Sequence, residues 1–511
     1  MASKDNIAAQ LAATALIGTE RAATWPEPGG DLAPSNAAQP AQTTECRFLT
    51  SVAAFDVYQR AGHMPSERSQ EVPHANAETM PRTAAGAASL LGRVLNGPQA
   101  HVLPEYLQLC ARSGQRVHER YLPDLLDLAA RDEALAPLVT PVLGERGRWL
   151  ATLNPAWSKL FADSTGGDVW ETGSRAQRAR LLQRQRASDP NAARTRLEAV
   201  WASEPPEERA AFLATLREGL SPLDEPLLEK ALDDKRKEVR EVAADLLARL
   251  PLSALCRRNI DRLKPLVKAK RPMLGKMTVQ IELPPDTFKD WARDGLAPKP
   301  LLEGLGDRAT MLARLIGATP LAFWHEHAGQ NAAEIAALTA KSEWRDAILL
   351  GLAAASTRQE DAATAKAVAT AWLQIEKSPV LPHHDAMLQD LIAVLPGETR
   401  EALAAPFLAN RKALDARALY LLLKASTHAW SHEFSRTFVR TLLDYVNATG
   451  GYSGYDAQQL LGDQVALRVD PALAPAANLL AQGAPDVRSN ALDKFLATLQ
   501  CRFDLHKELK P

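Results

Sequence analysis

Apolar residues recur three and four positions apart along most of the chain, and the clearest example lies between Pro226 and Pro251. The first half of this stretch places three of them on one helical face: Leu228, Ala231 and Leu232. The second half places five there: Val239, Ala243, Leu246, Leu247 and Leu250. Polar residues 233–237 separate the halves, and Pro251 ends the second. We predict two amphipathic helices joined by a turn, a pair that buries its apolar face only against neighbours of the same kind.

The same spacing predicts helices over most of the remaining chain. Near the N-terminus, helices are expected at residues 7–17 and 48–61. The second of these carries large side chains at helical spacing: Phe48, Val52, Phe55 and Tyr58. Residues 24–44 and 62–82 contain several prolines and little apolar content, so we expect loops there. Further helices are expected at residues 84–95, 105–110, 117–130, 134–143, 178–186, 192–202, 207–220, 252–267, 307–317, 320–328, 331–339, 343–355, 360–375, 385–395, 399–409, 412–425, 430–447, 456–467 and 485–499.

One stretch departs from the helical pattern. Residues 277–283 alternate polar and apolar side chains, as a half-buried strand does, and Pro284 and Pro285 end the alternation. We find no second alternating run in the chain. The sequence therefore predicts a single short β segment in a helical protein.

The helical pair also carries a resemblance to a known repeat. Its pattern resembles a HEAT repeat, an antiparallel helix pair that stacks into an α-solenoid, through Leu228, Ala231, Leu232, Asp234, Val239, Arg240, Ala243, Ala244 and Leu247. The resemblance implies that the aspartate of the turn and the arginine at the helix start link one repeat to the next. Arg236 and Lys237 take the place of the usual Asp-Pro of that turn. The match covers about one repeat, and any amphipathic helical hairpin shares part of the pattern.

Together these patterns predict an all-α fold: a HEAT-like α-solenoid of degenerate helical hairpins with one short β insertion near residues 277–283. We expect an N-terminal helical region at 1–204, HEAT-like repeats at 205–270, a loop with the β segment at 271–300, and a C-terminal helical array at 301–511.

A second resemblance extends over nearly the whole chain. Residues 15–21, Ala-Leu-Ile-Gly-Thr-Glu-Arg, resemble the opening motif of an uncharacterised bacterial family of helical proteins. Residues 142–151, followed by Asn-Pro-Ala-Trp at 154–157, resemble a second signature of that family. The resemblance implies companions of three kinds: MoxR-type AAA ATPases, von Willebrand A domain proteins and SWIM zinc-finger proteins. It assigns no catalytic residue.

Composition narrows the class of protein. Hydrophobic residues make up 46% of the 511 residues and charged residues 24%, which fits a globular chain. The formal net charge of -1 argues against a surface built as a whole for nucleic acid or anionic lipid. The four cysteines are scattered without metal-binding spacing, which is typical of a reducing compartment. No stretch approaches about 18 uncharged apolar residues, and residues 1–21 make a poor signal peptide. We expect a cytoplasmic protein.

Two basic stretches are candidate binding surfaces. Residues 175–196 carry seven arginines, and residues 256–276 carry eight lysines or arginines against one acid, Asp261. Clusters of this kind contact phosphates, although neither interleaves the aromatic residues that stack on bases. If a helix runs through the second stretch, three cations share one face: Lys264, Lys268 and Arg271. A solvated face or an acidic protein partner is the simpler interpretation.

Histidines and glycines give weaker signals. His428 and His432 are four apart on an expected helix and would face one metal, but solvent-facing side chains are the more common outcome. His325-Glu326-His327 and His383-His384-Asp385 have no common helical face. No glycine-rich phosphate loop is recognised. We expect no metal and no cofactor.

The sequence therefore predicts a non-enzymatic scaffold or adaptor that presents a helical-repeat surface to protein partners. The family resemblance makes a MoxR-type AAA ATPase or a von Willebrand A domain protein the candidate partner. The alternative is a HEAT-like nucleic-acid-binding protein, including an enzyme that acts on DNA, since some HEAT-like proteins are DNA glycosylases. A hydrolase or metal enzyme ranks third.

Overall fold

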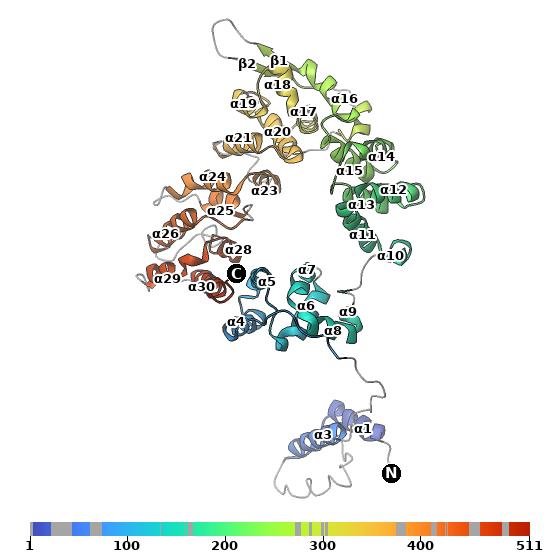
Figure 1. Ribbon diagram of the computed structural model, residues 1–511, viewed down its shortest axis with the longest axis vertical. Helices are drawn as coiled ribbons and strands as arrows, with labels where there is room; N and C mark the ends of the chain where they lie inside the picture. The colour runs from blue at the N-terminus through green and yellow to red at the C-terminus, as the bar shows by residue number, and fades with distance from the viewer. Residues whose placement is uncertain are drawn as a thin grey trace. The chain divides into compact units, whose positions relative to one another are not determined.

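The computed structural model divides the chain into two compact units, Met1–His74 and Ala75–Pro511 (Figure 1). It describes residues 4–21, 43–61, 74–132, 134–158, 160–161, 167–270, 277–285, 289–297, 301, 305–374, 385–409, 416–424, 426, 428–448, 460–482 and 490–510. Most of the two predicted N-terminal loops lies outside these residues.

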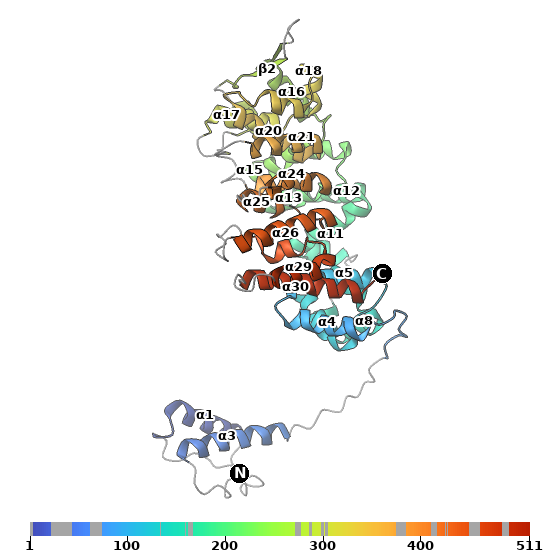
Figure 2. The ribbon, with the colours of Figure 1, turned by 90° about the vertical axis from the view of Figure 1, so that its left-hand side faces the viewer.

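The first unit is a pair of helices, α1 (Lys4–Ile17) and α3 (Thr44–Ala61), which lie side by side (Figure 2). Its core is small, because only Leu11, Phe48 and Phe55 form a buried apolar cluster among its described residues. The Thr19 hydroxyl donates to the Glu45 carboxylate at 3.4 Å and ties the end of α1 to the start of α3. Both helices expected in this region are confirmed.

The second unit begins with short helices that share one core. They are α4 (Ala85–Asn96), η2 (Ala100–Val102), α5 (Leu103–Arg112), η3 (Glu119–Tyr121), α6 (Leu122–Arg131), α7 (Ala136–Val139), η4 (Thr140–Val142), α8 (Gly144–Leu153) and α9 (Pro155–Ser158). Their core includes Leu107 and Leu125, and it also takes in Leu505 and Leu509 from the other end of the chain. The C-terminal helix therefore packs against the helices that open this unit.

A second core belongs to the helical pair that dominates the sequence pattern and to its neighbours. These elements are α10 (Gly167–Thr172), α11 (Arg175–Ser188), α12 (Pro190–Val200), α13 (Pro206–Thr215), η5 (Pro222–Asp224), α14 (Glu225–Ala231) and α15 (Lys237–Ala248). Within the group α11 packs against α13, and α13 against α15. Val239 and Leu247 are fully buried in this core, as predicted, and so are the apolar residues of the first helix, Leu228, Ala231 and Leu232.

The predicted β segment is present, and it has a partner that the sequence pattern missed. After α16 (Ala254–Leu263) and η6 (Lys264–Leu266) the chain forms β1 (Val267–Lys270), which pairs antiparallel with β2 (Thr278–Ile281). In the pairing register Val267 lies opposite Ile281. A lone strand leaves its backbone amides and carbonyls unpaired, so β2 is stable only with such a neighbour.

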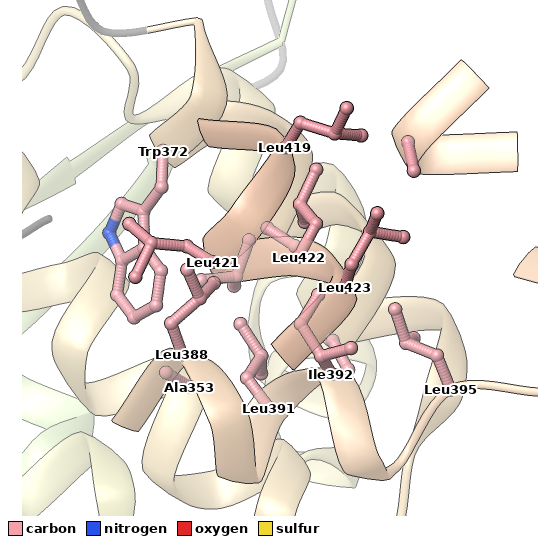
Figure 3. Close-up of a cluster of buried hydrophobic side chains, with 14 of the residues drawn as sticks. Ala353, Trp372, Leu388, Leu391, Ile392, Leu395, Leu419, Leu421, Leu422 and Leu423 are labelled. Carbon is pink, nitrogen blue, oxygen red and sulfur yellow. The ribbon is translucent and has the colours of Figure 1, made fainter. Parts of the chain in front are cut away.

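The remaining helices surround the largest core. They are η7 (Lys289–Asp294), α17 (Asp307–Gly317), α18 (Ala322–Ala328), α19 (Ala332–Leu338), α20 (Arg345–Gln359), α21 (Ala362–Leu373), α23 (Asp385–Ala393), α24 (Gly397–Ala409), α25 (Ala416–Lys424), α26 (His432–Ala448), α28 (Asp463–Ala466), η8 (Pro471–Leu473), α29 (Ala474–Gln482) and α30 (Asn490–Glu508). Figure 3 shows how Leu388 and Leu391 of α23 face Leu421 and Leu422 of α25, with Trp372 of α21 beside them.

The regular elements of the described chain are thus helices apart from two four-residue strands, and the all-α prediction is confirmed. Three separate cores follow one another along the second unit. The domain boundaries expected near residues 204, 270 and 300 stay predictions.

Candidate functional site

Three cations of the basic stretch at residues 256–276 form ion pairs within the chain: Arg258, Arg262 and Lys268. Arg258 binds Asp294 at 2.8 Å and Glu229 at 3.1 Å, and Arg262 binds Asp294 at 2.7 Å. Burial opposes ionisation of Asp294, but hydrogen bonds from Arg258 and Arg262 hold the pKa of its carboxyl below the ordinary value. These guanidinium groups fasten α16 to α14 and η7.

The three cations predicted to form a binding face do not share a helix. Lys264 begins η6 and Lys268 lies in β1, while Arg271 lies outside the described residues. The helix expected to run through this segment is wrong, because the chain becomes extended at Val267 and pairs with β2 instead. Lys268 forms an ion pair with Glu282 of the segment after β2. The role of these three cations in binding stays a prediction, and a common helical face no longer supports it.

Three arginines of the stretch at residues 175–196 form ion pairs inside the chain: Arg178, Arg186 and Arg194. Arg186 is fully buried and binds both carboxylate oxygens of Asp224 at 3.0 Å. It also donates to four backbone carbonyls. Arg178 forms a bidentate ion pair with Glu204. A buried charge with a full set of acceptors stabilises the fold, and removing one partner is strongly destabilising.

The two histidines considered as a metal pair lie on different segments. Helix α26 begins at His432, and His428 precedes it, so the helix expected to carry both is wrong. His428 Nδ1 lies 2.8 Å from Ser426 Oγ, and its Nε2 lies 3.4 Å from Glu401. His432 Nδ1 lies 2.7 Å from Asp470. Each ring therefore contacts a different carboxylate.

The other histidine clusters offer no metal site within the described part of the chain. His325 and His327 lie on α18, where the His327 ring stacks on Phe323. His383 and His384 lie outside the described residues. Among the residues that are described, no group of three or more His, Cys, Asp or Glu side chains is arranged to hold a metal.

The turn of the α14–α15 pair links it to the preceding helix. Asp234 in this turn binds Arg209 of α13 at 2.9 Å. The Arg240 guanidinium donates to the carbonyls of Asp234 and Lys235 at 2.8 and 3.0 Å. The aspartate therefore joins neighbouring helices, and the arginine closes the turn.

The first unit leaves apolar side chains on its surface. While Phe48 and Phe55 of α3 are buried, the opposite face of the helix is exposed: Leu49 by 63% and Val57 by 65%. Four exposed residues follow the spacing i, i+3, i+7, i+11 along this face, which we call the α3 stripe: Cys46, Leu49, Ala53 and Val57. Leu16 at the end of α1 is 89% exposed. Both helices of this unit carry apolar residues beyond those that pack between them.

A cavity of about 520 Å³ opens between α23, α25 and the segment that follows α28. We call it the Arg468 cavity. Its described lining residues are Gln389, Tyr420, Leu423, Lys424, Ser426, Gly462, Gln464, Val465 and Arg468. Two of these are cationic and none is acidic. Such a composition suits an anionic group.

Neither of these two features was singled out from the sequence. The α3 stripe has a signal, its regular spacing, but the buried stripe of Phe48 and Phe55 on the same helix masks it. Arg468 has no local signal, because α23, α25 and the turn after α28 meet only in the folded chain.

The second signature motif, at residues 142–151, has a structural role. Gly144 has a φ of +66°, and a Cβ there would lie 2.4 Å from the Glu78 carboxylate. The same carboxylate accepts the Glu145 amide at 2.9 Å and lies 3.4 Å from Arg116. Glycine at this position therefore lets Glu78 cap the first turn of α8.

Fold and surface together define an all-α protein in which many described helices pack against near neighbours in sequence and α30 packs against α4. The chain belongs to a family of unknown function, DUF5691, whose model matches residues 10–509. The resemblance to an uncharacterised family is thereby confirmed over nearly the full length. No curated protein and no solved structure matches the chain. None of the described helices is long and apolar enough to cross a membrane.

Proposed function

We propose that this protein is a non-enzymatic scaffold of HEAT-like helical pairs that binds a partner protein through the α3 stripe. The stripe is the observation that carries the proposal. A helix that is apolar on both faces is favoured in water only when both faces are covered. Among the described side chains, Leu11, Phe48 and Phe55 alone form the core between α1 and α3, so covering the outer face would add substantially to the burial of this unit.

The helical packing of the second unit supports the repeat part of the proposal. Helices two apart in the sequence pack together from α11 to α15, as they do when hairpins stack. The bond from Asp234 to Arg209 joins one hairpin to its predecessor, the role that the HEAT resemblance gives to this aspartate.

The spacing of the α3 stripe suggests how a partner would bind. Side chains at i, i+3, i+7 and i+11 on one helix are the anchors used when a helix lies in an apolar groove. We infer that the partner presents such a groove. The family resemblance makes a MoxR-type AAA ATPase or a von Willebrand A domain protein the first candidate, and the protein would act in the cytoplasm.

Size-exclusion chromatography of the full chain with each purified candidate tests the proposal. We expect a complex with wild type that is lost when Leu49→Glu and Val57→Glu are combined. Leu252→Glu is the matched control, because Leu252 is 82% exposed in the second unit and lies away from the stripe in sequence. A complex that survives the double change would show that the stripe is not the binding surface.

Cys46 gives a second readout of the same contact. It is exposed and lies in the α3 stripe, so alkylation at Cys46 should be fast in the free chain and slow in the complex. Cys110 serves as the internal reference, because it is buried and burial raises the pKa of its thiol to about 12. Unchanged alkylation of Cys46 within a stable complex would place the partner elsewhere.

Four arginines of the two basic stretches are already paired within the chain, which weakens the nucleic-acid alternative. Arg178, Arg186, Arg258 and Arg262 are bound to carboxylates of the same chain. Weak binding of duplex DNA at physiological salt is the expected outcome.

A further inference from the structure

We propose that the Arg468 cavity binds a small anionic ligand through a phosphate or carboxylate group, with Arg468 and Lys424 as its charged contacts. This inference does not rest on the scaffold proposal, because the cavity lies in the second unit and the α3 stripe in the first.

Two backbone hydrogen bonds hold Arg468 in place, whereas its guanidinium has no hydrogen-bond acceptor among the described residues. Its carbonyl accepts the Trp430 amide at 2.8 Å, and its amide donates to the Val465 carbonyl at 2.9 Å. The side chain is half-buried and lines the cavity. Burial and the nearby charge of Arg502 lower the pKa of Arg468, and the opposing charge of Glu105 only partly offsets them. The guanidinium is thus a partly desolvated cation that an anion would stabilise.

Arg502 lies in the same region and has the hydrogen bonds expected of an arginine that stabilises the fold. It donates to the carbonyls of Ala466 and Val469, at 2.7 and 2.5 Å, and binds Glu105 at 2.6 Å. Two arginines therefore approach the same turn, and among the described residues Arg502 has hydrogen-bond acceptors while Arg468 has none. Because the half-buried Arg468 side chain lines the cavity and has no hydrogen-bond acceptor among the described residues, its guanidinium is available to an anionic ligand.

The rest of the cavity suits an oxyanion. Lys424 is exposed and its Nζ lies 6.0 Å from the centre of the Tyr420 ring. Gln389 and Gln464 supply amide donors. Arginine and lysine together bind phosphate and carboxylate oxygens by charge and by hydrogen bonds.

The walls of the cavity are fixed by the core beneath them. Leu423 lines the cavity and belongs to the largest core, near Ile392 of α23 (Figure 3). Behind it the Trp430 Nε1–H donates to Ser426 Oγ at 3.2 Å. A site whose walls are already packed loses little entropy on binding.

Isothermal titration calorimetry of the full chain with inorganic pyrophosphate and with a short oligoglutamate peptide tests the proposal. We expect saturable binding of at least one probe, weakened about 10- to 100-fold by Arg468→Gln. Arg440→Gln is the control, because Arg440 is exposed on α26 and does not line the cavity. Pyrophosphate binding alone points to a free phosphate compound, and oligoglutamate binding alone to the acidic side chains of a protein.

The unfolding temperature of the ligand-free protein separates a binding role from a structural one. Arg468→Gln removes a partly desolvated charge beside Arg502, so the midpoint should rise by about 2 °C. A structural arginine would give a fall instead. A lower midpoint, failure of both probes to bind wild type at millimolar concentration, or equal binding by Arg468→Gln would overturn the proposal.

Discussion

Leu247 and Glu241 lie on the same helix in opposite surroundings. Leu247 is fully buried in the core shared by α10–α15. Glu241 faces solvent, where it forms a surface ion pair with Lys237 four residues earlier. Because an exposed pair of this kind contributes less than about 1 kcal/mol, the two positions make a matched comparison of core and surface.

Leu247→Ala should lower the free energy of unfolding by about 2–5 kcal/mol, since it removes buried apolar volume that the packed neighbours cannot fill. Glu241→Ala should lower it by less than about 1 kcal/mol. Urea unfolding followed by circular dichroism measures both. Equal effects of the two changes would mean that the face assigned to the core is wrong.

Burial of single residues was predictable from the sequence where the cause is local. Val239 and Leu247 follow from spacing along one helix, and both are fully buried. The partners of charged residues were not predictable in this way. Arg186 pairs with Asp224 across 38 positions, and Arg502 with Glu105 across 397. Long-range folding brings these groups together, so an arginine-rich stretch suggests a surface patch even though one of its arginines, Arg186, is fully buried.

At the scale of elements, the segment from α16 to β2 combines a helix, a 3₁₀ turn and a two-stranded hairpin. Pro265 lies within the turn, and Val267 continues into β1. Helix periodicity through Lys264 and Lys268 predicted a continuous helix here, because spacing alone does not reveal that β2 needs a partner strand. The start of α26 was predicted at residue 430, two residues before its observed start at His432. Here too the cause is a distant partner, because the Trp430 amide donates to the Arg468 carbonyl instead of belonging to the helix.

The triple change Lys264→Glu, Lys268→Glu, Arg271→Glu tests what this segment binds. We expect wild type to bind random-sequence duplex DNA only weakly at physiological salt, and the triple variant to differ little. Fluorescence anisotropy over a range of salt concentrations measures both affinity and salt slope. The exposed arginines of α26, Arg436 and Arg440, changed to Glu, provide the control.

A submicromolar complex that is lost only in the triple variant would favour the nucleic-acid alternative. In that case the log-log slope should fall by roughly one unit for each phosphate contact removed.

At the scale of the whole second unit, α30 connects the end of the chain to its opening helices. Arg502 and His506 of α30 both contact Glu105 of α5, at 2.6 and 2.8 Å. Burial opposes ionisation of Glu105, but hydrogen bonds from His506 and Arg502 hold the pKa of its carboxyl below the ordinary value. The ionised form of Glu105 therefore stabilises this contact.

Glu105→Gln should lower the free energy of unfolding at pH 7 by about 1.5–3 kcal/mol, because it removes the charge from these hydrogen bonds. Since the folded pKa of Glu105 is depressed, its contribution is complete above the unfolded value of about 4.3 and is lost as pH falls toward the folded value. The difference between wild type and variant should therefore shrink below about pH 4. Urea unfolding at several pH values measures it.

Glu433→Gln is the control for this prediction, because Glu433 is exposed in the first turn of α26. It should leave stability nearly unchanged at every pH. A difference for Glu105→Gln that stays constant with pH would show that its ionisation does not stabilise the contact.

The docking of α30 has a consequence for synthesis on the ribosome. Leu505 and Leu509 complete the core that begins at α4, so the helices of this unit that are translated first lack part of their packing until α30 has been made. Domains usually fold as they emerge, starting from the N-terminus. Here the core around α30 can close only after Leu509 has emerged from the ribosome, so the helices made first in this unit complete their packing only once α30 has been made.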